Sequence, residues 1–402
     1  MQGSCREAET RSHNRDVEPR CYETYGTSAS DSNAGRGMTE KPAGPAPRLS
    51  RYLNRKFFSD EIKFVILSDS MLDVLFKEHA EFIMSADGRN IKTEKSNITT
   101  TTEFILLGFS DVPHLKWILF GIFFLVYLCI VMCNSIVILV TRIDPALQTA
   151  MYFFLNKFSF VEICYVTVTI PRMLVDICAQ KGNISLLNCA IQMWFFLLFA
   201  ASECFLLTVM AYDRYVAICK PLLYALMMNH RVCVQLLAAC WASVIPVVTG
   251  QTYLIFSLPF CGSNRINHFF CDIPPILSLA CGDTFVNNLA IFTVSAVTIT
   301  IPFLLIIVSY GKIICSILKL SSTGGRSKAF STCSSHLMVV VLFYGTAAIT
   351  YIQPKANASE GIGKLVSLFY SVLIPLLNPI IYTLRNKEIS AALRKLPAKL
   401  LT

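Results

Sequence analysis

The amino-acid sequence predicts an all-α membrane protein that folds as a bundle of seven transmembrane helices. Only 15% of the 402 residues are charged and 54% are hydrophobic, whereas soluble domains carry roughly 25% charged residues. Seven apolar runs reach the roughly 20 residues that a helix needs to cross a bilayer, and the segments between them are short. We place these runs at about 115–140, 152–176, 190–212, 234–257, 286–311, 334–353 and 365–384.

Basic residues and glycosylation signals predict how the bundle is oriented. One set of alternate loops, together with the C-terminal end, carries thirteen Lys and Arg residues, whereas the opposite loops carry four. Because cytoplasmic loops are enriched in Lys and Arg, we place the first set in the cytoplasm and the N-terminus outside. Three Asn-x-Ser/Thr sequons, at Asn97, Asn183 and Asn357, all fall on the predicted outer side.

The N-terminal part of the chain divides into two predicted segments. Residues 1–83 are polar and mixed in charge, and their longest apolar patch is too short to span a membrane or to serve as a leader. We expect them to be an extension without a function in the core protein or the product of an upstream start; a disordered extracellular tail is the alternative. Residues 84–114 are expected to form an extracellular segment before the bundle at 115–384.

The C-terminal segment 385–402 predicts a cytoplasmic tail with a short amphipathic helix. Ile389, Ala392, Leu393 and Leu396 fall on one helical face, and basic residues lie among them. Such a helix lies in the interface and contacts membrane lipids.

Four outer cysteines stand apart from the others. Most of the 16 cysteines lie in apolar runs, where cysteine behaves as a small hydrophobic residue. Cys189 lies at the outer start of the third run, and Cys261, Cys271 and Cys281 lie in the loop between runs four and five. In an oxidising extracellular setting they pair and hold this loop across the bundle mouth. The sequence allows three connectivities, of which we favour Cys189–Cys271 with Cys261–Cys281.

Several motifs occur in order along the chain. They are "EFILLGFSD" before span one, "MYFFL" (Met151–Leu155), "MAYDRYVAICKPLLY" after span three, "SYGKI" (Ser309–Ile313), "KAFSTCSSHL" (Lys328–Leu337), "FYGT" (Phe343–Thr346) and "PLLNPIIYTLRN" (Pro375–Asn386). With seven spans, these motifs resemble a rhodopsin-like G-protein-coupled receptor, and more narrowly a vertebrate odorant receptor, from about Asn97 to Leu396. The resemblance implies a multi-pass plasma-membrane protein that binds a small volatile odorant. It also implies activation of a heterotrimeric G protein of the stimulatory, olfactory type and a rise in cAMP.

The resemblance also implies which residues contact the ligand. Matching family positions are Met193, Phe196, Leu197, Ala200, Ala201 and Cys204 in span three, Val294, Ser295 and Thr298 in span five, Tyr344, Ala347, Ala348 and Tyr351 in span six, and Leu368 and Ser371 in span seven. This apolar and aromatic set with a few hydroxyls suits small, neutral, mostly hydrophobic molecules. Phe196 stands where amine receptors carry Asp, so a cationic ligand lacks its counter-ion. Span seven has no interior Lys, which excludes a retinal Schiff base.

Three consecutive residues at the cytoplasmic end of span three, Asp213, Arg214 and Tyr215, are expected to control activation, and we call them the charged trio. Asp213 can hold Arg214 by a short charge-assisted hydrogen bond, and release of Arg214 toward Tyr310 and Tyr382 would open a crevice for a partner helix. The alternative interpretation is an anchor that snorkels to the interface. The full set that we assign to activation and G-protein coupling is Asp213, Arg214, Tyr215, Tyr310, Lys328, His336, Asn378, Pro379 and Tyr382.

Two carboxylates lie deep in the predicted bundle. Glu203 precedes Asp213 by ten residues, about 15 Å along a helix, and Glu162 lies within span two. With Asn134 and Asn378 facing inward, they could form a polar cluster in which either one carboxyl group is protonated or a cation sits between the two. The resemblance implies a structural sodium ion at Glu162 and Glu203; no other cofactor is expected.

Other classes of protein fit less well. We find no internal repeat of the kind that transporters show. The nearest constellation for an enzyme, His336 beside Ser334 and Ser335, lies inside the odorant-type motif, so no enzyme is predicted. The basic excess lacks the clustering with aromatics that nucleic-acid binding requires. The main alternative is a non-olfactory receptor of the same superfamily for a peptide or lipid ligand, against which the cysteine-held outer loop argues.

Overall fold

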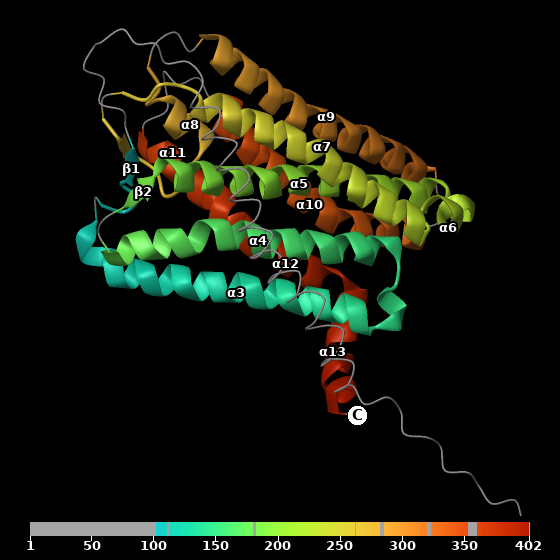
Figure 1. The fold of residues 1–402 in the computed structure, drawn as a ribbon. Coiled ribbons are helices and arrows are strands. Elements are labelled where there is room, and N and C mark those ends of the chain that lie inside the picture. Colours follow the sequence, from blue (N-terminus) through green and yellow to red (C-terminus); the bar gives the residue numbers. More distant parts are fainter. Residues whose placement is uncertain are drawn as a thin grey trace, which may run out of the picture. The chain divides into compact units, whose positions relative to one another are not determined.

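A computed structural model shows the predicted helical bundle. It describes residues 102–110, 112–179, 182–261, 263–281, 285–319, 323–352 and 360–401. The segment 1–83 and the sequons at Asn97 and Asn357 lie outside this range, while Asn183 is described and exposed. The helices that run alongside one another in Figure 1 are α3 (Lys116–Ile143), α4 (Ala150–Ala179), α5 (Leu186–Cys219), α7 (His230–Phe256), α9 (Phe285–Leu318), α10 (Thr323–Ile352) and a last span built from α11 (Glu360–Leu368), a π-helix (Phe369–Leu373) and α12 (Ile374–Arg385).

Their length and apolar composition explain why these segments form membrane helices. In the part of the chain that is described, six of them are long and apolar enough to cross a bilayer. The remaining one, α10, has 30 residues and an apolar stretch at Cys333–Ala347. A helix satisfies its backbone hydrogen bonds internally, which the hydrocarbon requires. The predicted all-α bundle is confirmed.

The third span, α5, is the central helix of the bundle. It packs against α4, α7, α9 and α10. Of its most apolar 18-residue stretch, 61% is buried, whereas the corresponding share is 22% for α3 and for α7. Two clusters of buried side chains surround it, one toward each membrane face. A helix enclosed in this way can carry polar residues without exposing them to lipid.

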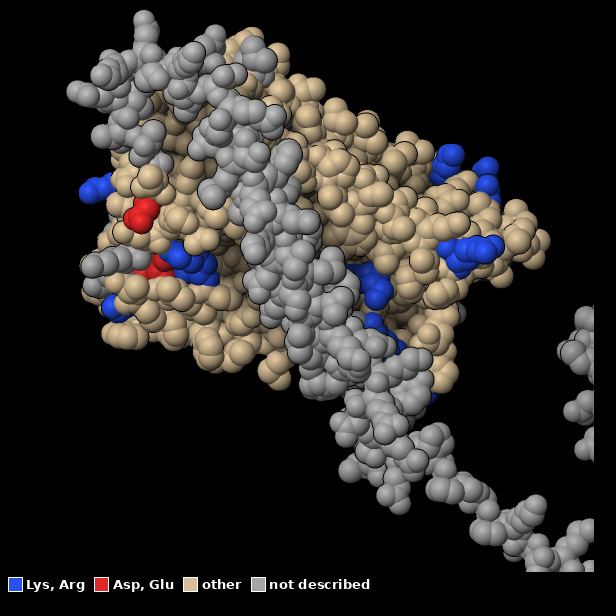
Figure 2. Space-filling view, viewed as in Figure 1, with Lys and Arg blue, Asp and Glu red and all other residues tan. Residues whose placement is uncertain are grey.

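Charge follows the orientation that the loops predict. On the face shown in Figure 2, Lys and Arg side chains gather near the end where α6 (Tyr224–Met227) lies, and the opposite end carries both signs. The end with α6 is therefore the cytoplasmic one.

The outer end carries a small β-sheet that the sequence analysis did not predict. The strands β1 (Glu103–Leu106), β2 (Asn183–Ser185) and β3 (Arg265–Ile266) pair in the order β2-β1-β3. Phe104 pairs with Ile184 in the antiparallel register, and Leu106 pairs with Ile266 in the parallel one. Phe104 and Leu106 are buried. The segment before span one thus forms the central strand of this outer sheet, which we call the β-cap.

The β-cap is also fastened to the helices below it. Arg172 of α4 donates to the Asn183 carbonyl at 2.7 Å, which holds β2. Lys364 of α11 donates to the Gly108 carbonyl at 3.1 Å, and the Gly108 N–H donates to the His268 carbonyl at 3.1 Å. Gly108 has φ = +47°, a region that glycine tolerates without cost.

The tail helix α13 (Lys387–Leu401) turns away from α12 (Figure 1). The Asn386 side chain caps it by accepting from the Glu388 and Ile389 N–H groups. Tyr152 of α4 donates to Glu388 at 2.5 Å. Of the face predicted to meet lipid, Ile389 and Ala392 are instead buried against the bundle, because α13 packs on α3 and α12. The Leu396 side chain lies outside the described part.

The close approach of Gly182 to β1 in the β-cap can be tested by substitution. A Cβ at Gly182 would overlap the Leu106 carbonyl oxygen, whereas a Cβ at Gly121 would meet nothing within 4 Å. We expect Gly182→Ala to break the hydrogen bond from Leu106 N–H to the Gly182 carbonyl and to lower stability by about 1–3 kcal/mol. Gly121→Ala is the matched control. Surface expression and thermal unfolding of the two variants decide this; equal values would contradict the close approach.

Candidate functional site

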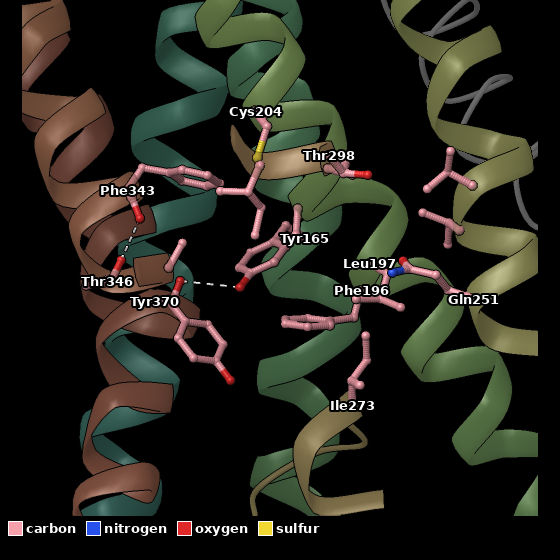
Figure 3. Close-up of a pocket in the computed structure, with 16 residues that line it drawn as sticks. Tyr165, Phe196, Leu197, Cys204, Gln251, Ile273, Thr298, Phe343, Thr346 and Tyr370 are labelled. Atoms are coloured by element: carbon pink, nitrogen blue, oxygen red, sulfur yellow. Dashed lines mark hydrogen bonds between the residues drawn. The ribbon is translucent and has the colours of Figure 1, made fainter. Parts of the chain in front are cut away.

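A cavity of about 100 Å³ lies in the outer half of the bundle (Figure 3). Six of the membrane spans and the short loop helix α8 contribute to its lining. Its lining residues are Tyr165 from α4, Phe196, Leu197, Ala200, Ala201 and Cys204 from α5, Val247, Val248 and Gln251 from α7, Ile273 from α8 (Ile273–Leu277), Thr298 and Ile299 from α9, Phe343, Thr346 and Ala347 from α10, and Tyr370 from the π-helix. The lining is mostly apolar, which suits binding by burial of hydrophobic surface.

The predicted ligand contacts fall into three groups. Phe196, Leu197, Ala200, Ala201, Cys204, Thr298 and Ala347 line the cavity. The side chains of Ser295, Ala348 and Tyr351 lie outside the described part. Met193, Val294, Tyr344, Leu368 and Ser371 are not among the lining residues of this cavity, and their contact with a ligand stays a prediction.

The structure shows where each of these five residues lies. Met193 is fully buried in the outer core, and Leu368 packs against the same cluster. Tyr344 lies below the cavity and donates to the Cys204 carbonyl at 3.3 Å. Ser371 donates to the Ser367 carbonyl of its own helix at 2.7 Å. The Val294 carbonyl accepts from Thr298 one turn further along α9.

Some of the lining residues that the sequence analysis missed come from elements that it did not consider, and others are neighbours of the residues that it named. Val247, Val248 and Gln251 belong to span four, where Gln251 was a usable signal because it is a polar residue in an apolar run. Ile273 comes from the outer loop, two residues after Cys271. Tyr165, Ile299, Phe343, Thr346 and Tyr370 complete the missed set.

The outer loop forms the ceiling of the cavity. The structure contains both favoured disulfides, Cys189–Cys271 and Cys261–Cys281. The first holds the loop on α5, and Phe270 beside it packs on Phe196 with ring centroids 4.9 Å apart. Tyr370 donates to the buried Asp272 carboxylate at 2.7 Å, which ties the ceiling to the last span.

A buried histidine lies in this ceiling. The His268 side chain is 5% exposed, and its Nδ1 lies 3.0 Å from the Phe270 carbonyl oxygen, so Nδ1 carries the proton. Burial lowers the pKa of His268; the nearby Asp272 carboxylate opposes this shift, and the Lys364 ammonium adds to it. His268 is therefore neutral at neutral pH.

A polar cluster lies at mid-membrane between α4, α5 and α12. Glu162, Glu203 and Asn378 are all buried, Asn378 donates to Glu162, and the two carboxyl groups interact electrostatically. Asn134, which the sequence analysis grouped with these residues, is also buried, but its side chain donates to the Ile130 carbonyl of its own helix. Among the residues described, Glu162 Oε2, Glu203 Oε1 and Asn378 Oδ1 have no hydrogen-bond partner.

The charged trio at the cytoplasmic end of α5 is paired as expected from the sequence. Arg214 Nη2 donates to Asp213 Oδ2 at 2.8 Å, and the Arg214 side chain is 11% exposed. Tyr224 of α6 donates to the other oxygen, Oδ1, at 2.8 Å. Burial and the Asp213 charge raise the pKa of Tyr224, so its hydroxyl stays protonated and remains a donor. The sequence analysis missed this contact because the sequence does not show that the loop folds back and brings Tyr224 to Asp213.

Most of the other residues assigned to activation lie on α9, α10 and α12. The Tyr310 hydroxyl lies 2.7 Å from His336 Nδ1, which joins α9 to α10. Tyr382 is buried, and its hydroxyl has no partner in the described set. Lys220 and Lys312 both lie over the Tyr215 ring, at 5.8 and 5.5 Å. Pro379 lies inside α12, and the Lys328 side chain lies outside the described part.

A seven-helix bundle with a cavity in its outer half and a paired Asp-Arg at its cytoplasmic end defines a seven-transmembrane receptor. Among solved structures, squid rhodopsin shares this fold with a TM-score of 0.54 at 17% sequence identity, covering 70% of this chain and 85% of that one. The model of the olfactory receptor family matches residues 123–399. The chain therefore belongs to the olfactory receptor family of G-protein-coupled receptors, which are receptors and not enzymes, and it is a multi-pass protein of the plasma membrane.

Three curated relatives illustrate the similarity. Olfactory receptor 10AG1 of Homo sapiens is 68% identical over 300 residues, which are 75% of this chain and 100% of that protein. Olfactory receptor 10C1 of Homo sapiens is 51% identical over 300 residues, covering 75% and 96%. Olfactory receptor 5G29 of Mus musculus is 50% identical over 302 residues, with the same coverage.

The ceiling histidine generates a pH prediction. Because the folded-state pKa of His268 is lowered, stability is fully present above the unfolded value of about 6.5 and is lost as the pH falls below it. We expect thermal unfolding of the purified receptor to occur at lower temperature at pH 5.5 than at pH 7.5. His268→Asn should reduce this difference, and His230→Asn, at an exposed cytoplasmic histidine, should not. Identical pH profiles for wild type and His268→Asn would contradict the assignment.

Proposed function

We propose that this receptor binds small, neutral, mostly hydrophobic odorants in the cavity and activates a heterotrimeric G protein of the stimulatory, olfactory type, which raises cAMP. The observation that carries the proposal is that one helix, α5, both lines a small apolar cavity and carries Arg214 held by Asp213. Cys204 lines the cavity nine residues before Asp213, and α5 connects the two without a break.

The size and cover of the cavity favour an odorant over a peptide. The ceiling residue Ile273 lies over it, and the loop that carries Ile273 is held by two disulfides. About 100 Å³ holds a small molecule but not a peptide chain. The described lining contains no Asp, Glu, Lys, Arg or His, so a charged ligand would be buried without a counter-ion.

The helix α10 connects ligand contact to the cytoplasmic end. Phe343 and Thr346 of α10 line the cavity, and Tyr344 between them donates to α5 at the Cys204 carbonyl. Two turns toward the cytoplasm, His336 contacts Tyr310. A ligand that displaces α10 from α5 therefore alters the contact that occupies the Tyr310 hydroxyl.

Release of Arg214 is the step that opens the cytoplasmic side. In the observed state both oxygens of Asp213 are engaged, one by Arg214 and one by Tyr224. A guanidinium only donates hydrogen bonds, so it requires acceptors after release, and the Tyr310 and Tyr382 hydroxyl oxygens supply them. The ammonium groups of Lys220 and Lys312 suit an acidic face of the G protein, and the exposed Arg394 and Lys395 on α13 suit anionic lipid headgroups.

A structural sodium ion fits the mid-membrane cluster. Three buried oxygens there, from Glu162, Glu203 and Asn378, have no partner in the described range, and hard cations take oxygen ligands. These residues would hold the ion, which would compensate two adjacent carboxylates and keep α4, α5 and α12 in the inactive packing. A protonated carboxyl network without an ion is the competing interpretation.

A cAMP reporter assay tests the proposed signalling. The receptor is expressed with trafficking helpers in cells that lack stimulatory α subunits, with or without the olfactory-type subunit added back, and is challenged with volatile odorants. We expect a response only with the subunit present. Arg214→Ala should reduce it at least about tenfold at unchanged surface expression. Arg231→Ala, which removes a charge from the exposed cytoplasmic start of α7, should leave it intact.

Three results would contradict the proposal. A response that persists without a stimulatory subunit would refute the coupling. Full signalling by Arg214→Ala would refute the proposed role of Arg214 release in activation. A well-expressed receptor that ignores odorants but answers peptides or lipids would refute the ligand class.

The sodium proposal has a separate readout. We expect NaCl to raise the thermal unfolding temperature of the purified receptor above its value in choline chloride at equal ionic strength, because only the native state binds the ion. Glu203→Gln should lose this difference. Equal unfolding temperatures in both salts for the wild type would favour the protonated network.

A further inference from the structure

The threonine hydroxyls of the cavity use their protons within their own helices. Thr298 Oγ1 donates to the Val294 carbonyl at 2.8 Å. Thr346 Oγ1 lies 2.8 Å from the carbonyls of both Leu342 and Phe343, the second of which is drawn in Figure 3. A hydroxyl has one proton and two lone pairs, so toward a ligand each of these threonines acts as an acceptor.

The tyrosine hydroxyls at the cavity are engaged in the same way. Tyr370 donates to the Asp272 carboxylate at 2.7 Å, a charge-assisted bond that a neutral ligand does not displace easily. Tyr165 donates to the Tyr370 carbonyl at 3.4 Å. The hydroxyl groups of the described lining thus present acceptor oxygens.

Residue 298 presents a second acceptor because of the proline that follows it. In an α-helix the carbonyl of Thr298 would accept from the N–H of residue 302, but that residue is Pro302, which has no N–H. The α9 wall therefore carries two oxygen acceptors at one residue, the side-chain Oγ1 and the backbone carbonyl that lacks its intrahelical donor.

The labelled side chains lie on two sides of the cavity. In Figure 3, Thr298 and Gln251 lie toward one side, whereas Phe343, Thr346 and Tyr370 lie toward the other. Gln251 is the one residue of the described lining whose side chain carries N–H donors. A group beside Thr298 that donates a hydrogen bond matches this side better than a group that only accepts.

We propose that the ligands of this receptor are small neutral alcohols, whose hydroxyl group donates to Thr298 while the hydrocarbon part lies against the aromatic side of the cavity. The inference rests on the proposed function, since it names the chemical class of the odorant. A water-sized group takes about 10–15 Å³ of cavity volume, so the 100 Å³ corresponds to roughly seven to ten non-hydrogen atoms.

Isomeric pairs of ligands test this inference in the cAMP assay. Each straight-chain alcohol is compared with the methyl ether of the same formula, for example heptan-1-ol with 1-methoxyhexane, because the ether keeps the size and the acceptor but lacks the donor. We expect the half-maximal concentration for the alcohol to be about three- to tenfold lower, as one neutral hydrogen bond provides. Thr298→Val should reduce this difference, because only the backbone carbonyl of residue 298 remains as an acceptor, and Thr298→Ser should preserve it.

The control variant is Thr293→Val on the same helix. Thr293 makes the same bond to the carbonyl four residues earlier, at 2.7 Å from Leu289, but it is exposed to the outside, so its loss should leave both ligands unaffected. Thr298→Ala replaces Thr298→Val if the latter fails to reach the surface, and the comparison of alcohol with ether in the wild type stands without any variant.

The outcomes separate the two proposals. Ethers as potent as alcohols on the wild type, or a Thr298→Val loss that is equal for both ligands, would overturn the alcohol class and leave the odorant function standing. A wild-type receptor at the surface that answers neither ligand series but answers peptides would instead overturn the proposed function itself.

Discussion

The hydrocarbon of the bilayer offers no hydrogen bonds, so each polar group within the bundle depends on a partner inside the protein. The structure meets this constraint mostly by local bonds. Thr141, Ser202 and Thr208 each donate to the carbonyl four residues earlier in their own helix. Local bonding of this kind costs little and leaves each hydroxyl oxygen as an acceptor. The chemistry of the cavity follows from the same rule, because its threonines obey it too.

The constraint also identifies where the bundle is built for change. Five of the seven buried side-chain atoms without a hydrogen-bond partner in the described residues belong to Glu162, Glu203, Asn378, Tyr382 and His336; the other two are Asp176 Oδ1 and Thr252 Oγ1. Buried polar groups normally find a partner, so such a concentration marks a place where an ion, water or a rearranged side chain supplies one. Glu203 belongs to α5, whose cytoplasmic end carries Arg214. The proposed activation mechanism therefore includes these buried groups together with Asp213 and Arg214.

The sequence predicted the spans well because length and apolarity decide them. It placed the sixth span at 334–353, whereas α10 begins at Thr323, since a helix continues past the membrane where composition no longer marks it. The sheet could not be predicted, because β1 is short and pairs with strands about 80 and 160 residues further along the chain. Span four was overlooked as a cavity wall because an apolar helix carries little sign of which face is inward.

The contacts around the cavity differ in strength, and this difference sets the direction in which a ligand acts. The ceiling is held on α5 by the Cys189–Cys271 disulfide and on the last span by the Asp272–Tyr370 bond, one covalent and one charge-assisted. On the cytoplasmic side of the cavity, α10 meets α5 through the 3.3 Å bond of Tyr344 to a neutral carbonyl, and a bond of this kind contributes only about 1 kcal/mol. Under the proposed function, we therefore expect a ligand that needs more room to displace α10 before it displaces the ceiling. Since His336 lies on α10 and Tyr310 on α9, that displacement reaches the acceptor that Arg214 requires.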